Sequence, residues 1–452
     1  MPMARPAQPI APRQVLIVVS SYFPAMPASI HRARLLAWSL AECGWQVQIL
    51  APSAEFQRPE WMDPKAPAFF NPATPCLEAK PILDQVFRFL GMNSAGWRGF
   101  VPMYLAGARL LKSAHFDLVY ISTTAFNLFC LGRIWRSRFG VPYVLDFQDP
   151  WFRPRSSAKT TRHRFKAWVG DRLSRYLEKF SVWGARGLVA VSPEYLTSLK
   201  ARYPHAQAFA AGAAVEIPFG VRVEDFSAVD GSVEVRDEAK GLCTIGYVGV
   251  GDVVMQKSFR RLVAGLARLR RRAPDIVNRC RIQLAGTKGG WRDGERKVLW
   301  EEAAAVGIGD LVVEDPRIVA YSAAVSQAVA ADGLLVLGVD DSAYMPSKLF
   351  LYALTGKPLL ACMKWASQVD SVFREFPDLG TLIHFLAPEE VEADEDALLL
   401  EFLRQVIAGR RFTRSAVQER HSAAAMTRRH VELFEACLSS KPQVGRAIVP
   451  HE

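Results

Sequence analysis

The sequence predicts an α/β protein with two βα-repeating domains that face each other across a cleft. Strand-like apolar runs alternate with helix-like runs along most of the 452 residues, which favours parallel sheets covered by helices. The chain is too long for one ordinary core. The alternation also breaks once near the middle. Two such halves place a ligand cleft at the carboxyl ends of their strands.

The first half begins with one βαβ unit and resumes its alternation after an insert. A strand at 14–20, a proline-containing loop, a helix at 30–44 and a second strand at 45–52 make up the unit. The insert, at about 53–105, is irregular and rich in proline and aromatic residues. The following elements are predicted at 116–122, 125–140, 141–152, 186–192 and 193–203.

The second half follows a stretch without long periodic runs, which predicts a linker at 219–238. Its strands and helices are predicted at 243–250, 260–272, 281–286, 295–307, 311–315, 322–331, 332–339, 347–356 and 358–363. Amphipathic helices between Asp394 and Leu438 close the chain. The predicted domains are therefore 1–218, with the insert inside it, and 239–408, followed by C-terminal helices and tail at 409–452.

The charge is strongly positive and is concentrated in two segments. The net charge is +11, and the segment from Arg153 to Arg186 holds ten Lys and Arg against only Asp171 and Glu178. A second basic cluster runs over 260–272. Both have the spacing of helices with one polar face. They indicate either a solvated face or attraction to an anion, such as a phospholipid surface or a pyrophosphate-linked substrate. No nucleic-acid module is recognisable, so nucleic acid is not an expected partner.

The cysteines and the apolar runs limit the class of protein further. Seven cysteines are scattered without any CxxC, which favours a reduced interior over disulfides or a zinc site. No apolar run approaches the roughly 18 residues of a membrane span. The first apolar stretch, from Val15, is too short and too strand-like for a signal peptide.

The stretch MPSKLFLYALTGKPLLA, at 345–361, predicts a short helix followed by a strand. Ser347 is a natural N-cap, Pro346 fixes the entry and Gly356 is placed to end the helix. A helix N-terminus carries roughly half a positive charge and several unpaired N–H groups. Lys348 adds a formal charge there, which is typical of a phosphate site, although Ser-Lys also starts many helices that bind nothing.

This order of features resembles the family 4 glycosyltransferases, which have the two-domain GT-B fold, over about Gln14 to Leu438. The segment VLIVVSSYFPAMPASIHRARLLAWSLAECGWQVQILAP resembles the family's opening strand, loop, helix and second strand. LVAVSPEYLTSLKARYP with IPFGVRVEDF is similar to its linker region, and IGYVGVGDVVMQKSFRRLVAGLARL to its first C-terminal strand. SKLFLYALTGKPLLA resembles its nucleotide-binding helix. The resemblance implies two Rossmann-like domains, with C-terminal helices packing back toward the N-terminal one.

The resemblance further implies that the C-terminal half holds a nucleotide-sugar donor, without a metal or any other cofactor. The donor-binding residues it implies are Gly249, Lys257, Ser347, Lys348 and Leu351. Cations and helix dipoles aimed at the departing diphosphate would stabilise its developing charge. Leu351 stands where the family usually has a Glu that binds the ribose, and Val250 stands where many relatives have Arg. Either another group binds the ribose, or the nucleotide is bound weakly, or donor binding has been lost.

On the acceptor side, the segment DFQDPW places two carboxylates at the end of a predicted strand. Asp149 and Asp146 are the catalytic candidates, because either can orient or deprotonate an acceptor hydroxyl; capping of a turn is the alternative role for Asp149. Gln148 stands where many relatives have His. The other acceptor-side candidates are Trp151 in the same segment and His31 and Arg32 at the start of the first helix.

The favoured function is transfer of a sugar from a nucleoside-diphosphate sugar to a glycan or lipid-linked acceptor. The resemblance implies retention of the anomeric configuration. A non-catalytic relative that binds carbohydrate or a partner protein is the alternative, and a sugar-nucleotide epimerase or hydrolase is a third. A dinucleotide oxidoreductase and a serine hydrolase are disfavoured, because no G-x-G-x-x-G follows the first strand and no G-x-S-x-G occurs.

The expected localisation is cytoplasmic, with peripheral attachment to the inner face of the membrane if the insert touches lipid. Aromatic residues in the insert can stack on sugars, lie at a membrane interface or simply pack the loop. They are Trp61, Phe69, Phe70, Trp97 and Phe100.

Overall fold

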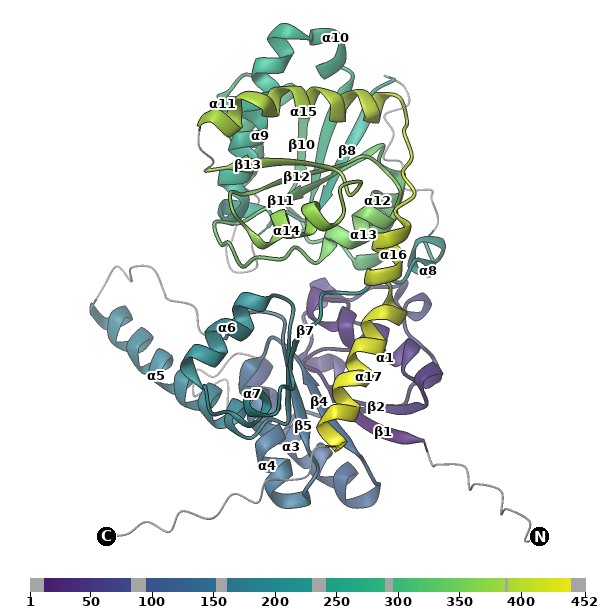
Figure 1. The fold of residues 1–452 in the computed structure, drawn as a ribbon, viewed down its shortest axis with the longest axis vertical. Helices are drawn as coiled ribbons and strands as arrows, with labels where there is room; N and C mark the ends of the chain where they lie inside the picture. The colour runs from purple at the N-terminus through teal and green to yellow at the C-terminus, as the bar shows by residue number, and fades with distance from the viewer. Residues whose placement is uncertain are drawn as a thin grey trace, which may run out of the picture.

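The protein is described from a computed structural model, over residues 12–82, 95–151, 161–229, 241–288, 296–386 and 389–439. Parts of the predicted insert, basic segment, linker and tail lie outside these ranges, at 83–94, 153–160, 230–238 and 440–452. Two α/β domains lie one above the other, each with a central sheet flanked by helices (Figure 1).

The N-terminal domain is built on a 7-stranded parallel sheet of order β3-β2-β1-β4-β5-β6-β7. Its strands are β1 (Arg13–Val18), β2 (Trp45–Pro52), β3 (Cys76–Ala79), β4 (Leu118–Ser122), β5 (Tyr143–Phe147), β6 (Gly187–Ala190) and β7 (Ala214–Glu216). Its helices are α1 (His31–Ser39), α3 (Ala95–Ser113), α4 (Cys130–Phe139), α5 (Thr161–Trp183), α6 (Pro193–Arg202) and α7 (Gln207–Ala210). β4, β5 and β6 are buried at every position, as expected for parallel strands covered on both faces.

The C-terminal domain repeats this design on a 6-stranded parallel sheet of order β10-β9-β8-β11-β12-β13. Its strands are β8 (Cys243–Val248), β9 (Cys280–Ala285), β10 (Val312–Asp315), β11 (Gly333–Leu337), β12 (Leu359–Lys364) and β13 (Thr381–Phe385). Its helices are α9 (Asp252–Arg272), α10 (Pro274–Val277), α11 (Val298–Ala305), α12 (Tyr321–Ala330), α13 (Lys348–Leu354), α14 (Gln368–Glu375), α15 (Glu389–Ile407) and α16 (Ser415–His421). In each sheet the strand order reverses beside the first strand, which is where ligands bind in open α/β sheets.

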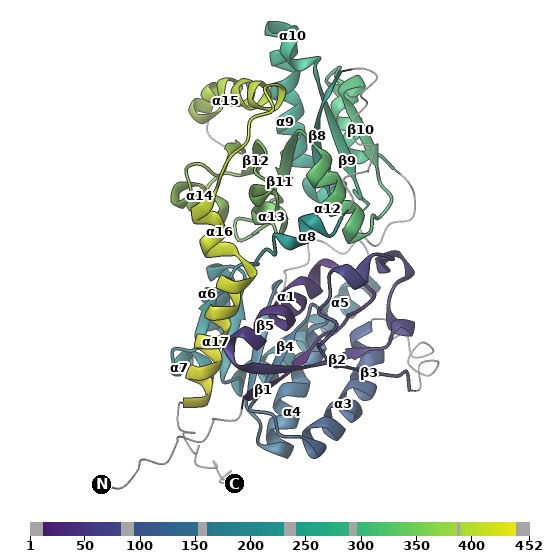
Figure 2. The same cartoon turned by 90° about the vertical axis from the view of Figure 1, so that its right-hand side faces the viewer.

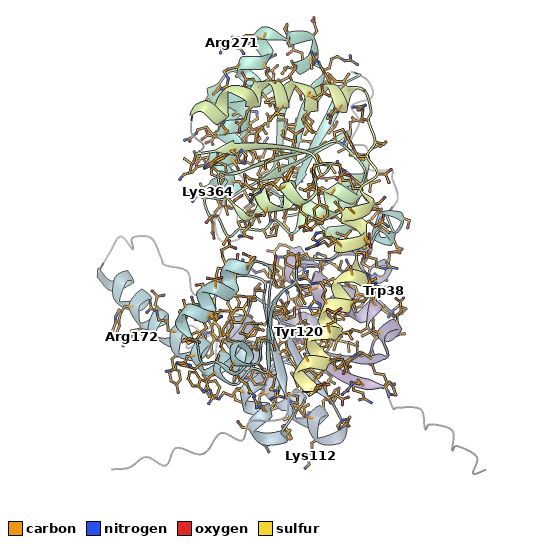
Figure 3. The ribbon with its side chains drawn as sticks, viewed as in Figure 1. Trp38, Lys112, Tyr120, Arg172, Arg271 and Lys364 are labelled. Atoms are coloured by element: carbon orange, nitrogen blue, oxygen red, sulfur yellow. The ribbon has the colours of Figure 1, made fainter. Side chains whose placement is uncertain are left out.

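The chain passes between the domains twice. A linker containing α8 (Glu224–Ser227) leads from β7 to β8, and the chain returns after α16 into α17 (Ala423–Ser439). α17 lies along the N-terminal domain in both views (Figures 1 and 2). There the hydroxyl of Tyr120 of β4 (Figure 3) lies 3.1 Å from His430 Nε2. The ring of Phe434 packs edge-on against Trp45. The predicted α/β class, the two facing domains and the returning C-terminal helices are confirmed.

The structure adds elements that the sequence patterns did not indicate. β3 lies inside the predicted insert and extends the sheet beside β2, and β13 forms an edge of the second sheet. Within the insert, Phe69 and Phe70 are buried in the core of the N-terminal domain. These two aromatic residues therefore pack the loop and do not face a sugar or a membrane.

Candidate functional site

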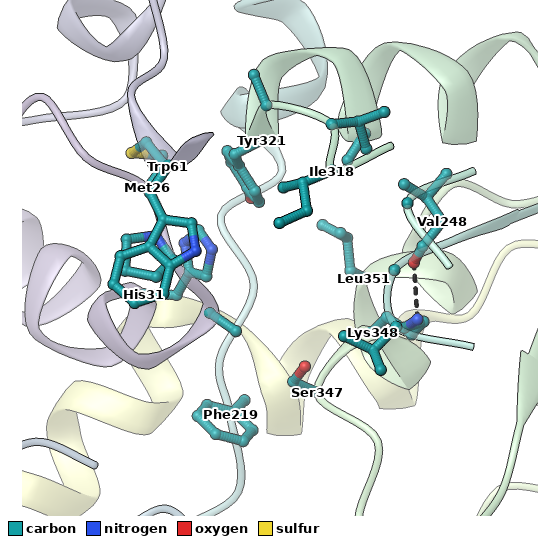
Figure 4. Close-up of a pocket in the computed structure, with 18 of the residues that line it drawn as sticks. Met26, His31, Trp61, Phe219, Val248, Ile318, Tyr321, Ser347, Lys348 and Leu351 are labelled. Carbon is teal, nitrogen blue, oxygen red and sulfur yellow. Dashed lines mark hydrogen bonds between the residues drawn. The ribbon is translucent and has the colours of Figure 1, made fainter. Parts of the chain in front are cut away.

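A pocket of about 590 Å³ lies between the two domains, with walls from both. We call it the cleft pocket (Figure 4). It is lined by Met26, Pro27, Ala28, His31, Arg34, Leu35, Arg58, Glu60 and Trp61 of the N-terminal domain, by Phe219–Val221, Arg222 and Asp225 of the linker, and by Val248–Val250, Met255, Gly286, Lys288, Ile318–Tyr321, Ala324, Tyr344, Ser347, Lys348, Leu351 and Tyr352 of the C-terminal domain. Its basic side chains outnumber its acidic ones, so the pocket favours an anion.

The C-terminal wall consists of the segments that follow β8, β9, β10 and β11. Gly249, directly after β8, has φ +124°, and a Cβ there would lie 2.7 Å from Lys348 Nζ. A side chain at this position would therefore meet the lysine. The structure brings four of the predicted donor-binding residues together here, namely Gly249, Ser347, Lys348 and Leu351.

Lys348 is the first residue of α13 and brings a cationic side chain to the start of this helix. Its Nζ donates to Val248 O over 2.7 Å and lies 4.0 Å from the ring centroid of Tyr247 (Figure 4). Because burial disfavours the charged ammonium, the pKa of Lys348 falls to about 7. A bound anion would supply the negative partner that this amine lacks among the contacts described here.

Ser347 and Leu351 flank this lysine on the pocket side. Ser347 occupies the N-cap position, as predicted, but its side chain makes no capping hydrogen bond, so its hydroxyl is not engaged with α13. Leu351 lies one turn later and lines the pocket, which agrees with the face expected from helical spacing. Val250, the second departure from the family pattern, is 47% exposed and also lines the pocket.

The N-terminal wall is formed largely by α1. The ring of His31 lies against Tyr321, with centroids 4.2 Å apart, and its Nδ1 is buried without a hydrogen bond. Burial, and then the nearby Arg34, hold the pKa of His31 well below its ordinary value, so the imidazole is neutral at pH 7. Arg34 is itself fixed by Asp225 over 2.6 Å. No sequence pattern points to Arg34, Asp225 or Tyr321, which meet only through the fold.

The insert reaches across to the C-terminal domain. Asp63 accepts hydrogen bonds from the backbone N–H of Ser322 (2.7 Å) and from its hydroxyl (2.8 Å), and both residues are buried. Ala320, at the N-cap of α12, has no side chain that can serve as a cap. Asp63 therefore caps this helix from the other domain. The adjacent residues Ile318–Tyr321 line the cleft pocket, so the contact also fixes one of its walls.

A second pocket, of about 230 Å³, lies beside the end of β5, and we call it the side pocket. Trp151 lines it and stacks on Phe126 at an interplanar angle of 17°. Its other lining residues are Phe147, Pro150, Glu178, Glu194, Tyr195, Ser198, Leu199, Arg202, Asp341 and Ala343. Asp149, between Gln148 and Pro150 in the chain, is close enough to Tyr344 that its charge, after burial, raises the pKa of that tyrosine. Tyr344 lines the cleft pocket, and Pro150, the residue after Asp149, lines the side pocket.

Several predicted residues lie outside the lining of both pockets. Asp146 and Arg32 form a fully buried ion pair, with Asp146 Oδ2 3.0 Å from Arg32 Nε. Gln148 donates to Ser29 O and Ser122 Oγ, each over 2.9 Å. Lys257 is half-exposed on α9, where it pairs with Asp340, which Lys364 also contacts at 2.9 Å. These contacts connect elements of the fold.

Comparison with known proteins gives one family match and several matches of fold. Residues 29–210 match the glycosyl transferase 4-like domain. HepE of Anabaena, in complex with UDP-glucose, is 14% identical, with a TM-score of 0.55 over 94% of this chain and 99% of its own. An α,α-trehalose-phosphate synthase (UDP-forming) from Burkholderia vietnamiensis is 12% identical, with a TM-score of 0.60 over 94% of this chain and 98% of its own. The N-terminal domain of a trehalose-6-phosphate phosphatase from Candida albicans is 12% identical, with a TM-score of 0.59 over 96% of this chain and 99% of its own. None of the curated proteins matches the chain.

Proposed function

Because residues 29–210 match the glycosyl transferase 4-like domain and the chain has the GT-B fold, we propose that it transfers a sugar from a UDP-sugar to a glycan or lipid-linked acceptor. The observation that carries the proposal is the cleft pocket, where Lys348 Nζ and the unengaged hydroxyl of Ser347 lie at the carboxyl ends of the strands. UDP as the leaving group is supported by HepE, a protein of the same fold that is known in complex with UDP-glucose.

In the proposed complex the diphosphate lies against Lys348 and Ser347. As the bond between the sugar and the diphosphate breaks, negative charge develops on the leaving oxygen. A cation already in place stabilises that charge without reorganisation. Arg58 and Lys288 also line the pocket and add to its positive potential. We therefore propose that these side chains, and not a metal ion, neutralise the leaving group.

The acceptor in this proposal occupies the side pocket, with its reacting hydroxyl beside Asp149. Trp151 is held face-on by Phe126 and offers an aromatic surface for a sugar ring. Asp149, next to Pro150 of the side pocket, would orient the hydroxyl toward the anomeric carbon. The family resemblance favours retention of configuration, which NMR of the first product formed would test.

Calorimetric titration with UDP, GDP and ADP, each with and without Mg²⁺, tests the donor half of the proposal. We expect UDP to bind at micromolar strength without metal, and GDP and ADP to bind more weakly. Failure of all three nucleotides to bind to the folded protein would reject the donor site.

The acceptor half is tested by Asp149→Asn. This variant is expected to lower turnover while UDP affinity stays unchanged, because Asp149 does not line the cleft pocket, where UDP is proposed to bind. A variant with weakened UDP binding and normal turnover would reject the acceptor-side role.

A further inference from the structure

The helix α5 carries an unusual outward-facing apolar surface. Five large apolar side chains on it are strongly exposed, at 55% for Trp168, 44% for Val169, 44% for Leu173, 66% for Tyr176 and 42% for Trp183. Surface helices of globular proteins normally turn such residues toward the core. A patch of this kind marks an interaction site.

The orientation of α5 follows from its opposite face. Glu178, Ser181 and Val182 are buried against the domain. The exposed residues 169, 173, 176 and 183 are spaced by four, three and seven, so they lie together on the outer side. Figure 1 shows the first turns of α5 extending away from the other helices of the N-terminal domain. The apolar surface is therefore a property of the folded domain.

Basic side chains border this surface. Arg172 and Lys179 are exposed, with the guanidinium of Arg172 5.0 Å from the ring of Trp168 and Lys179 Nζ 5.8 Å from the ring of Trp183. Arg175 is exposed between them. Of the two acidic residues on α5, Glu178 is buried and paired with Arg202, and Asp171 is half-buried. The border of the apolar surface is thus positive.

We propose that α5 docks the protein on an anionic phospholipid bilayer. Trp and Tyr side chains favour the boundary between headgroups and acyl chains, and Arg and Lys beside them reach anionic headgroups. The exposed face therefore offers apolar groups for the acyl chains and cationic groups for the anionic headgroups. No described helix is both long enough and apolar enough to cross a bilayer, so α5 would lie in the surface.

Docking through α5 would bring the acceptor side of the cleft to the lipid. Glu178 of α5 lines the side pocket, and Tyr176, Leu177 and Phe180 line a small apolar pocket of about 180 Å³ with Trp97. This last step rests on the proposed function and deepens it, because it selects a lipid-linked acceptor over a free glycan.

Co-sedimentation with vesicles tests the docking. The probes are vesicles of phosphatidylcholine alone and vesicles of phosphatidylcholine and phosphatidylglycerol in equal parts. We expect at least tenfold tighter binding to the anionic vesicles, and at least a tenfold loss in the double variant Leu173→Glu/Tyr176→Glu. Val313→Glu/Leu398→Glu, at comparably exposed positions of the C-terminal domain, is the matched control and should bind as the wild type does.

The basic border is tested separately with Arg172→Glu/Lys179→Glu, which should lose the preference for anionic vesicles. Arg271→Glu/Arg410→Glu is the matched charge control, with Arg271 far from α5 (Figure 3). Equal binding of the wild type to both vesicle types would overturn the proposal, as would apolar-face variants that bind like their control. A wild-type dimer that Leu173→Glu/Tyr176→Glu converts to a monomer would instead assign the face to a second copy. UDP titration without vesicles reports on the donor site independently.

Discussion

Lys348 is the residue whose environment sets the chemistry of the cleft pocket. Its amine has a carbonyl and an aromatic ring as partners but no carboxylate among its described contacts, whereas Lys257 is paired with Asp340 outside the pocket. We expect Lys348→Ala to weaken UDP binding by about 1–3 kcal/mol, since a charged hydrogen bond to phosphate is lost. Lys257→Ala serves as the control and should leave the affinity, measured by calorimetry, within about twofold. Equal effects of both substitutions would place the diphosphate nearer to α9.

The lowered pKa of Lys348 predicts a pH dependence of UDP binding. The free amine titrates at about 7, and a bound diphosphate raises that pKa, so binding above pH 7 must take up a proton. The dissociation constant should therefore rise by up to roughly tenfold per pH unit above about pH 7. Calorimetry in buffers of different ionisation enthalpy measures the proton uptake. Lys348→Gln should abolish both effects, and an unchanged pH profile in that variant would assign the titration to another group.

The presence of leucine at position 351 predicts that the pocket does not recognise the ribose hydroxyls through this position. A leucine cannot accept a hydrogen bond, so the wild type should bind UDP and 2′-deoxy-UDP within about threefold of each other. Leu351→Glu should introduce a preference for UDP of about 1–3 kcal/mol, because the carboxylate lies one turn from Ser347 on the pocket face. A wild type that already discriminates strongly would show that another group binds the ribose.

At the residue scale, local spacing was enough to place Ser347, Lys348 and Leu351 on one pocket wall. It could not show that Asp146 and Arg32 neutralise each other in the interior, because 114 positions separate them and only the parallel pairing of β1, β4 and β5 brings them close. The same holds for Arg34 and Asp225. The functional use of Asp149, Gln148 and Trp151 stays a prediction.

At the scale of elements, β13, α14 and α15 are joined by one ionisable cluster. His384 Nε2 lies 2.7 Å from Asp370, and Glu395 accepts the His384 backbone N–H over 2.6 Å. Although burial lowers the pKa of His384, its hydrogen bonds to Asp370 and Glu395 raise it to about 9. Its stabilising effect is therefore complete below the unfolded pKa of about 6.5 and is lost as the pH rises through about 9.

His384→Gln tests this cluster. We expect the variant to unfold more easily than the wild type by about 1–3 kcal/mol at pH 6, and the difference to shrink by pH 10, where the histidine is neutral. Urea unfolding at the two pH values measures it. A difference that persists at high pH would indicate packing, not charge.

Elements with strong periodicity were predictable from the sequence, and elements defined by pairing were not. The helix from Lys348 to Leu354 stops two residues before Gly356, which has φ +74° and was expected to end it. β3 has only one fully buried residue, Ala79, so its pairing with β2 leaves little trace in its apolar pattern. β13, an edge strand, has only two fully buried residues, so its pairing with β12 also leaves little trace in its apolar pattern.

At the scale of the whole molecule, Asp63 couples the insert to the donor-side wall. Removing its carboxylate in Asp63→Ala leaves the backbone N–H of Ser322 without that partner, which should cost about 1–2 kcal/mol of stability. Because Ile318–Tyr321 adjoin this cap, UDP affinity should fall as well. Thermal unfolding and calorimetry measure the two effects, and Asp63→Asn, which keeps an acceptor, should restore part of both. Unchanged UDP binding in Asp63→Ala would show that the wall holds without the cap.

The two passages of the chain between the domains are bonded to each other. The N–H of Val221 in the linker donates to His421 O over 2.8 Å, and the N–H of Ala423 donates to Val221 O over 2.7 Å. With the hydrogen bonds from Ser322 to Asp63, the two domains are therefore bonded to each other at two separate places. Phe219 and Gly220, which line the cleft pocket, adjoin the first of these places, and Trp61 adjoins the second. A change in the width of the cleft must therefore break or strain one of the two contacts, and a pair of distance probes in the two domains can follow it.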